Sequence, residues 1–195
     1  MAEVTRVDPL RMDMAQKWMP VPLWDEVAES TAGLAMRTLS LPAVHVVTGK
    51  LHMAERQMGL PRDLIGWPEV AQGERYAVRL GRDKALVVGM PELTAGWHAQ
   101  GFGVSPSESA GVVFEIKGPL MPRWLALGSE FGLSRASRAA TRQFGAFGTV
   151  MYRHGDPMTL RVHVSRPLAT AFLTWLRQTM THVEPTSEHD PGDPG

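Results

Sequence analysis

Cysteine is absent from the 195 residues of this chain. Disulfides, thiol catalysis, iron–sulfur clusters and cysteine-ligated zinc are therefore excluded. No apolar run approaches the roughly 20 residues that a helix needs to span a bilayer, so we expect no membrane partner. The chain begins Met1-Ala-Glu-Val-Thr-Arg6, without a basic start followed by an apolar run. We therefore expect no signal peptide and a cytoplasmic location.

An excess of charge of either sign is also missing, because 20 Lys and Arg residues balance 20 Asp and Glu residues. Nucleic-acid-binding proteins carry a basic patch or stripe, so we expect no nucleic-acid partner. The sequence has no complete Gly-rich dinucleotide fingerprint, no phosphate loop and no pair of histidines at metal-binding spacing on a helix. We therefore expect no catalytic, cofactor-binding or metal-binding residues in this chain.

Residues 1–40 are expected to form an N-terminal arm. Prolines punctuate this segment, and a helix is possible only from Asp25 to Arg37. Disordered tails usually lack aromatic residues, whereas this segment contains Trp18 and Trp24. We interpret it as an arm that docks either on a partner or on the chain's own core, and the sequence favours neither over the other.

Residues 41–183 are expected to form a single α+β domain of two similar halves. The predictions rest on alternating apolar residues for strands and on helical spacing for helices. The first half, 41–100, is predicted to contain strand 44–47, helix 51–58, hairpin strands 76–81 and 84–89, and helix 92–100. The second half, 101–183, is predicted to contain a loop at 101–109, strand 111–117, helix 119–127, strands 144–153 and 158–164, and helix 166–182. Each half then reads β-α-β-β-α, which indicates two packed split β-α-β units.

The final predicted helix has the clearest pattern, because its large apolar residues recur at helical spacing and define one stripe. The stripe consists of Leu168, Phe172, Trp175, Leu176 and Met180. Residues 184–195, which follow the helix, are acidic and contain three prolines. We expect this end of the chain to be a disordered acidic tail.

Two of the seven histidines, His45 and His163, lie on predicted strands. Both alternate with apolar neighbours along the chain. Successive side chains of a strand point to opposite faces of the sheet. We therefore expect both imidazoles to face away from the core.

Three arginines form the one basic cluster of note. Ser134 suits the N-cap of a helical turn that would place Arg135 and Arg138 on one face, and Arg142 follows shortly after. Arg binds carboxylates with bidentate geometry, so the cluster could pair with acidic side chains of a partner or with an anionic cofactor. A solvated basic face is the remaining alternative. The candidate partner-interface residues are Trp18, Trp24, Arg135, Arg138 and Arg142.

Four segments together resemble the gamma subunit of heterotetrameric sarcosine oxidase, in an order that spans residues 44–177. The first two are Met58-Gly-Leu-Pro61 and Val78-Arg-Leu-Gly-Arg-Asp-Lys-Ala-Leu-Val-Val-Gly89. The third is Val112-Val-Phe-Glu-Ile-Lys-Gly-Pro119 with Leu125-Ala-Leu-Gly128. The fourth is Val150-Met-Tyr-Arg153, followed by Leu160-Arg-Val-His-Val-Ser-Arg166 and Leu173-Thr-Trp-Leu176.

The resemblance implies a fold similar to the folate-binding domain of aminomethyltransferases. It also implies a structural role beside alpha, beta and delta subunits. In such complexes FAD, FMN, NAD and tetrahydrofolate are held by the other subunits. The complex demethylates sarcosine oxidatively to glycine, with release of hydrogen peroxide and transfer of a one-carbon unit to tetrahydrofolate. Two alternatives are a free-standing folate-binding protein of the aminomethyltransferase superfamily and a domain that binds a small effector, which no motif specifically supports.

Overall fold

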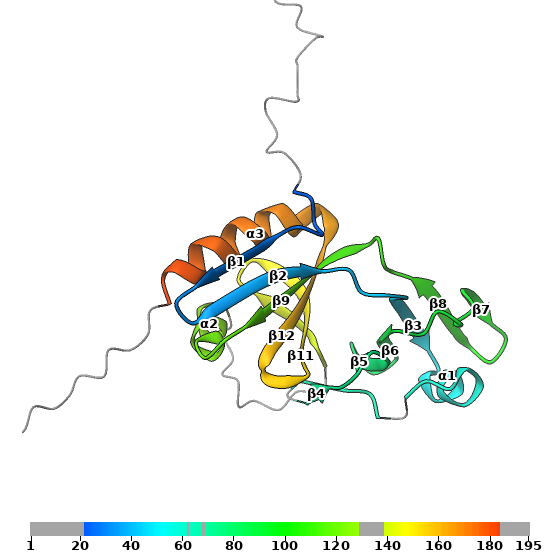
Figure 1. The fold of residues 1–195 in the computed structure, drawn as a ribbon. Coiled ribbons are helices and arrows are strands. Elements are labelled where there is room, and N and C mark those ends of the chain that lie inside the picture. Colours follow the sequence, from blue (N-terminus) through cyan, green and yellow to red (C-terminus); the bar gives the residue numbers. More distant parts are fainter. Residues whose placement is uncertain (1–21, 62, 68, 129–138, 184–195) are drawn as a thin grey trace, which may run out of the picture.

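The computed structural model describes residues 22–61, 63–67, 69–128 and 139–183, which form twelve strands and three helices (Figure 1). The strands are β1 (Ala28–Thr31), β2 (Leu34–Leu39), β3 (His45–Gly49), β4 (Val70–Ala71), β5 (Tyr76–Arg79), β6 (Lys84–Val88), β7 (Gly96–His98), β8 (Phe102–Pro106), β9 (Gly111–Lys117), β10 (Thr141–Phe144), β11 (Phe147–His154) and β12 (Asp156–Ser165). The helices are α1 (Leu51–Met58), α2 (Met121–Gly128) and α3 (Arg166–Thr181).

The larger sheet has seven strands in the order β1-β2-β9-β12-β11-β10, with β4 paired in parallel to β11. The other neighbours in this sheet are antiparallel. Helices α2 and α3 contribute to the core on one face of it. There Phe172 of α3 packs against Phe114 of β9 and Phe147 of β11, with ring centroids 5.1 and 5.2 Å apart.

The smaller sheet has five strands in the order β5-β6-β3-β8-β7, and each neighbouring pair is antiparallel. Helix α1 packs on one face of it, where Leu51 and Ala54 join Val47 and Phe102 in a second core cluster. Figure 1 shows α1 beside β3, at the end of the molecule away from α2 and α3.

A third apolar cluster lies between the two sheets. It joins Val78 and Leu86 of the smaller sheet to Tyr152 of the larger one. Because side chains alternate along a strand, Val47 points towards α1, whereas its neighbour Val46 points towards the other sheet. The layers are therefore α2 with α3, the seven-stranded sheet, the five-stranded sheet, and α1.

The two sheets repeat one strand order. In the smaller sheet β6 lies between β3 and β5, and in the larger sheet β12 lies between β9 and β11. A helix follows the first strand of each set, α1 after β3 and α2 after β9. The fold is thus a mixed α/β architecture of mostly antiparallel sheets.

Several predicted elements are confirmed, among them the strand at 44–47, helix α1, the β5–β6 hairpin, β9, α2, β12 and α3. Helix α1 ends as predicted at Gly59, which adopts the left-handed conformation (φ 66°) and donates its N–H to the carbonyl of Glu55. Glycine takes this conformation without the steric cost that a Cβ imposes. The predicted strand 144–153 is instead two strands, β10 and β11, joined by a turn.

The possible helix from Asp25 to Arg37 is wrong, because residues 28–39 form the β1–β2 hairpin of the larger sheet. Leu34 and Met36 are buried on the face that α2 and α3 cover, which is the alternation of a strand. Pairing of β2 with β9 adds ladder hydrogen bonds to this burial. These residues are therefore not part of an arm. The rest of the expected arm, residues 1–21, and the expected tail, 184–195, lie outside the described residues.

The predicted helix 92–100 and the predicted loop 101–109 are also wrong. The chain forms β7 and β8 there, and both strands join the smaller sheet. Gly96 lies in the middle of the predicted helix, where glycine is unfavourable. Phe102 and Val104 alternate towards the α1 cluster, and the ring of His98 stacks on Phe102 at 4.5 Å. The boundary between the two sequence halves therefore differs from the boundary between the sheets.

The apolar stripe of α3 is confirmed at Phe172, Leu176 and Met180, which are buried together with Ala169 and Leu173. Leu168, however, is 42% exposed, and Trp175 is only partly buried. The stripe is rotated towards residues 169 and 173 because α3 lies over β9 and β12 along that side.

Candidate binding cleft between the two sheets

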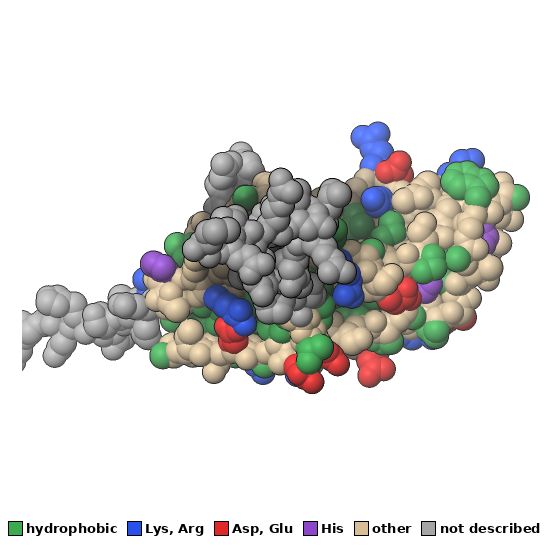
Figure 2. Space-filling model, turned by 90° about the horizontal axis from the view of Figure 1, so that it is seen from above, with side chains coloured by type: hydrophobic (Ala, Val, Ile, Leu, Met, Phe, Trp, Pro, Cys, Tyr) green, Lys and Arg blue, Asp and Glu red, His purple; other side chains and the backbone are tan. Residues whose placement is uncertain are grey.

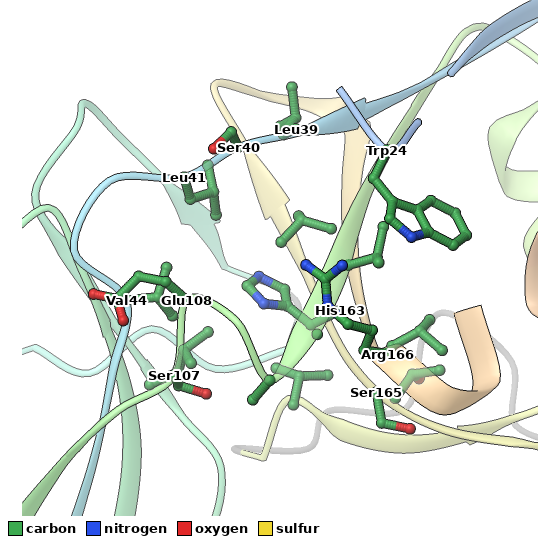
Figure 3. A pocket seen from close by; sticks show the side chains of 18 of the residues that line it. Trp24, Leu39, Ser40, Leu41, Val44, Ser107, Glu108, His163, Ser165 and Arg166 are labelled. Carbon is green, nitrogen blue, oxygen red and sulfur yellow. The ribbon is translucent and has the colours of Figure 1, made fainter. Parts of the chain in front are cut away.

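A cleft with a volume of about 870 Å³ opens between the two sheets (Figure 3). Its walls are mostly apolar and come from both inner faces. The smaller sheet and the segment before it contribute Leu41, Val44, Val46 and Leu86, and the larger sheet contributes Val113 and Val150. Polar side chains at one side of the cleft include His163 of β12 and Arg166 at the start of α3.

The cleft exists because the inner face of β11 loses bulk along its length. Tyr152, Val150 and Gly148 occupy successive inner positions of this strand. Tyr152 is fully buried and fills the space between the sheets. Val150 and Gly148 line the cleft, and a Cβ at Gly148 would meet no atom within 4 Å. The side chains at these positions decrease in size from the phenol ring of Tyr152 to the single hydrogen of Gly148. The space between the sheets is therefore left unfilled near Gly148.

A chain of hydrogen bonds crosses from one sheet to the other beside the cleft. Arg161 Nη1 donates to the hydroxyl of Tyr76 at 2.8 Å. The Tyr76 and Tyr152 hydroxyls are 2.9 Å apart, and the Tyr152 hydroxyl is 2.9 Å from His163 Nε2. Arg161 is itself held by the buried carboxylate of Glu115 through Oε2, at 3.3 Å.

The tautomer of His163 depends on the direction of these bonds. Arg161 can only donate, so the Tyr76 oxygen accepts from it. When Tyr76 donates to Tyr152 and Tyr152 donates to Nε2 of His163, the imidazole carries its hydrogen on Nδ1. When Nε2 donates to Tyr152 instead, Nδ1 is an acceptor.

Burial keeps the two central groups of this hydrogen-bond chain, Tyr152 and His163, uncharged. Desolvation, with a smaller contribution from Arg161, lowers the pKa of His163 to about 3. Desolvation and the neighbouring Tyr76 raise the pKa of Tyr152 well above its ordinary value. A base with so low a pKa abstracts protons poorly near neutral pH, and its Nε2 is already bonded to Tyr152. The arrangement is suited to binding rather than to proton transfer.

The prediction that both histidines face away from the core is wrong. His45 is 6% exposed and lies on the same face of β3 as Val47, towards α1. His163 points away from α2 and α3 but into the space between the sheets, because the smaller sheet covers that second face. The alternation was visible in the sequence, whereas the second covering layer was not.

Among the predicted interface residues, Trp18, Arg135 and Arg138 lie outside the described residues. Trp24 is half-buried, packs edge-on against Phe114 at 6.0 Å and lines the rim of the cleft.

Arg142 lies on β10, at the opposite edge of the larger sheet from β1. Its guanidinium lies 5.4 Å from the ring centroid of Trp67, which Arg153 also faces at 5.2 Å. Desolvation lowers the pKa of Arg142. The structure therefore does not bring Trp24 and Arg142 together, and their role at an interface stays a prediction.

The sequence analysis missed Trp97, which is 74% exposed on the edge strand β7. Its ring lies over Gly103 of β8, where a Cβ would come within 3.3 Å of a ring carbon. The signal was the Gly96-Trp97 pair inside a segment that we predicted to be helical. Figure 2 shows acidic and basic side chains interspersed on one face of the described molecule, without a broad area of one sign.

No helix in the described ranges is long and apolar enough to cross a membrane. No group of three or more His, Asp or Glu side chains in those ranges lies close enough together to hold a metal ion.

Neither protein-family models nor curated proteins match the sequence. Among solved structures, a chain of the heterotetrameric sarcosine oxidase from Corynebacterium sp. U-96, solved in complex with pyrrole 2-carboxylate, is similar in fold. The TM-score is 0.63 and the sequence identity 13%, and the match covers 83% of this chain and 91% of that one. This chain therefore shares its mixed α/β, mostly antiparallel fold with one chain of a heterotetrameric sarcosine oxidase.

Proposed function

We propose that this chain is a non-catalytic structural subunit, equivalent to the gamma subunit, of a complex similar to heterotetrameric sarcosine oxidase. The observation that carries the proposal is the shared fold, which extends over 91% of the matching oxidase chain. The four sequence segments that resemble the gamma subunit also support it.

The chemistry of the cleft agrees with a subunit that does not catalyse. His163 has a pKa of about 3, and its Nε2 is bonded to Tyr152. Under the proposal, the alpha, beta and delta subunits hold FAD, FMN, NAD and tetrahydrofolate. They carry out the oxidative demethylation of sarcosine in the cytoplasm, and this chain contributes to assembly.

Trp97 is the described residue best suited to a contact with these subunits. It is the most exposed of the large hydrophobic side chains, and it lies on an edge strand. Tryptophan is enriched among the few residues that supply most of the binding energy of interfaces. Burial of this side chain by a partner would remove a large apolar surface from water.

The experiment is affinity purification of the tagged chain after co-expression with the candidate alpha, beta and delta subunits from the same genome. The proposal predicts that a yellow, flavin-containing complex is retained and that it oxidises sarcosine with release of hydrogen peroxide. Retention of this chain alone, with full oxidase activity in the unbound fraction, would contradict the proposal and favour the free-standing folate-binding alternative.

A further inference from the structure

The inter-sheet cleft has the size and lining of a small-molecule site. Pockets for small ligands typically measure about 300–1,000 Å³ and combine apolar walls with a few convergent polar groups. The cleft measures about 870 Å³, and valine and leucine are the commonest residues in its walls. Facing sheets lie about 10 Å apart, so a molecule held between them has to be thin in that direction.

The polar side of the cleft offers His163 and Arg166 as hydrogen-bonding groups. Nε2 of His163 is bonded to Tyr152, and Nδ1, which donates when Nε2 accepts, has no hydrogen-bond partner among the described residues. Arg166 follows three residues later, and its Nε donates to the carbonyl of Ser109. Figure 3 shows the imidazole and the guanidinium both projecting into the cleft from the end of β12 and the start of α3.

The surroundings hold the ring in one place. Nε2 of His163 is bonded to the Tyr152 hydroxyl, which is bonded to Tyr76, and Tyr76 accepts from Arg161. A ligand oxygen at Nδ1 favours the tautomer that carries its hydrogen there, in which Nε2 accepts from Tyr152. Asp25 and Glu108 also line the cleft, but at the end where His163 lies the positive charge of Arg166 favours an anionic group.

We propose that this cleft binds a flat, largely apolar small molecule that carries a carboxylate or carbonyl group, with the acceptor oxygen at His163 Nδ1 and beside Arg166. The proposal concerns this chain's own residues and does not depend on its being a subunit of an oxidase.

The test uses two probes with the same apolar body and opposite head groups, 2-naphthoate and 2-naphthylmethylamine. Each is titrated into the full chain, with binding followed by calorimetry and by the NMR signal of the His163 imidazole. We expect 2-naphthoate to bind with a dissociation constant of about 1 mM or tighter and to shift the Nδ1 resonance. The amine, which would place a cation beside the guanidinium of Arg166, should bind at least tenfold more weakly.

Two glycine substitutions locate the site. Gly148→Leu places a side chain in the cleft, whereas Gly81→Leu places the same side chain on the β5–β6 turn outside it. Neither position has an atom within 4 Å of the added Cβ. We expect Gly148→Leu to weaken naphthoate binding at least tenfold and Gly81→Leu to leave it unchanged. Arg166→Gln should reduce the preference for the acid over the amine.

Three results would overturn the proposal. They are no naphthoate binding, equal binding of acid and amine, and naphthoate binding that Gly148→Leu leaves unchanged. The last result would place the probe elsewhere on the protein, for example at the exposed ring of Trp97.

Discussion

The Tyr152 hydroxyl lies in the middle of the buried hydrogen-bond chain that joins the two sheets. Tyr152→Phe removes it and leaves the Tyr76 hydroxyl and His163 Nε2 each without this partner. Buried polar groups that lose their partner cost about 1–3 kcal/mol. We expect the free energy of unfolding, measured with urea, to fall by about this amount. An unchanged unfolding midpoint would mean that the chain of bonds contributes nothing to stability.

Protonation of His163 is coupled to folding. Its pKa is about 3 in the folded protein, against an ordinary value of 6.5. Between these pH values the unfolded chain binds a proton that the folded one excludes. Stability from this group is therefore complete above pH 6.5 and is lost as the pH falls towards 3, by up to about 1.4 kcal/mol per pH unit.

Urea unfolding between about pH 7.5 and about pH 5 measures this loss. His163→Gln should make the decrease in stability shallower, whereas His52→Gln on the exposed side of α1 serves as the matched control. An NMR titration in which the His163 ring signals move with a midpoint near 6.5 would refute the account.

At the scale of elements, two glycines with left-handed backbone differ in their surroundings. Gly59 ends α1 at φ 66° with open space around its missing Cβ, whereas Gly89 follows β6 at φ 76°. A Cβ at Gly89 would lie 2.0 Å from the carbonyl oxygen of Glu74. Gly59→Ala should cost about 1–2 kcal/mol, the usual strain of this conformation.

Gly89→Ala adds a collision with backbone to that strain and should lower the urea midpoint clearly further. Similar urea midpoints for the two variants would show that the backbone near Gly89 shifts to relieve the collision without a loss of stability.

Elements with a local signal were predictable from the sequence. The β-branched run at 44–47 predicted β3, and Gly59-Leu60-Pro61 predicted the end of α1, each to within a residue or two. The β1–β2 hairpin and the β7–β8 pair were not predicted, because β2 pairs with β9 and β8 pairs with β3, which are distant in the sequence. Leu34 and Met36 fit a strand face only once β9 is known to lie beside them.

The candidate site shows the same limit. His163 was identified as a strand residue with apolar neighbours, yet its function depends on which layer covers its face. The cleft forms where Gly148 faces the inner side of the smaller sheet. The local sequence around Gly148 does not indicate that another sheet lies opposite it. By contrast, the expectation that aromatic side chains serve an interface pointed to Trp18 and Trp24, whereas the most exposed described tryptophan is Trp97.

At the scale of the whole molecule, an exposed Trp97 should matter for assembly and little for folding. Trp97→Ala should weaken retention of the candidate oxidase subunits at least tenfold, since central interface tryptophans commonly supply 2 kcal/mol or more. Binding is measured by interferometry on the immobilised chain. The unfolding midpoint should change little. Leu127→Ala, at an exposed position on α2, is the control, and equal losses for both variants would argue against a specific contact at β7.

A subunit of a heterotetramer should assemble with its partners when they are present. Size-exclusion chromatography with light-scattering mass analysis measures this for the chain expressed with and without the candidate alpha, beta and delta subunits. We expect co-elution in one complex that contains a single copy of each subunit or a fixed multiple. A monomer whose elution and mass are the same in the presence of all three partners would show that the chain is not such a subunit.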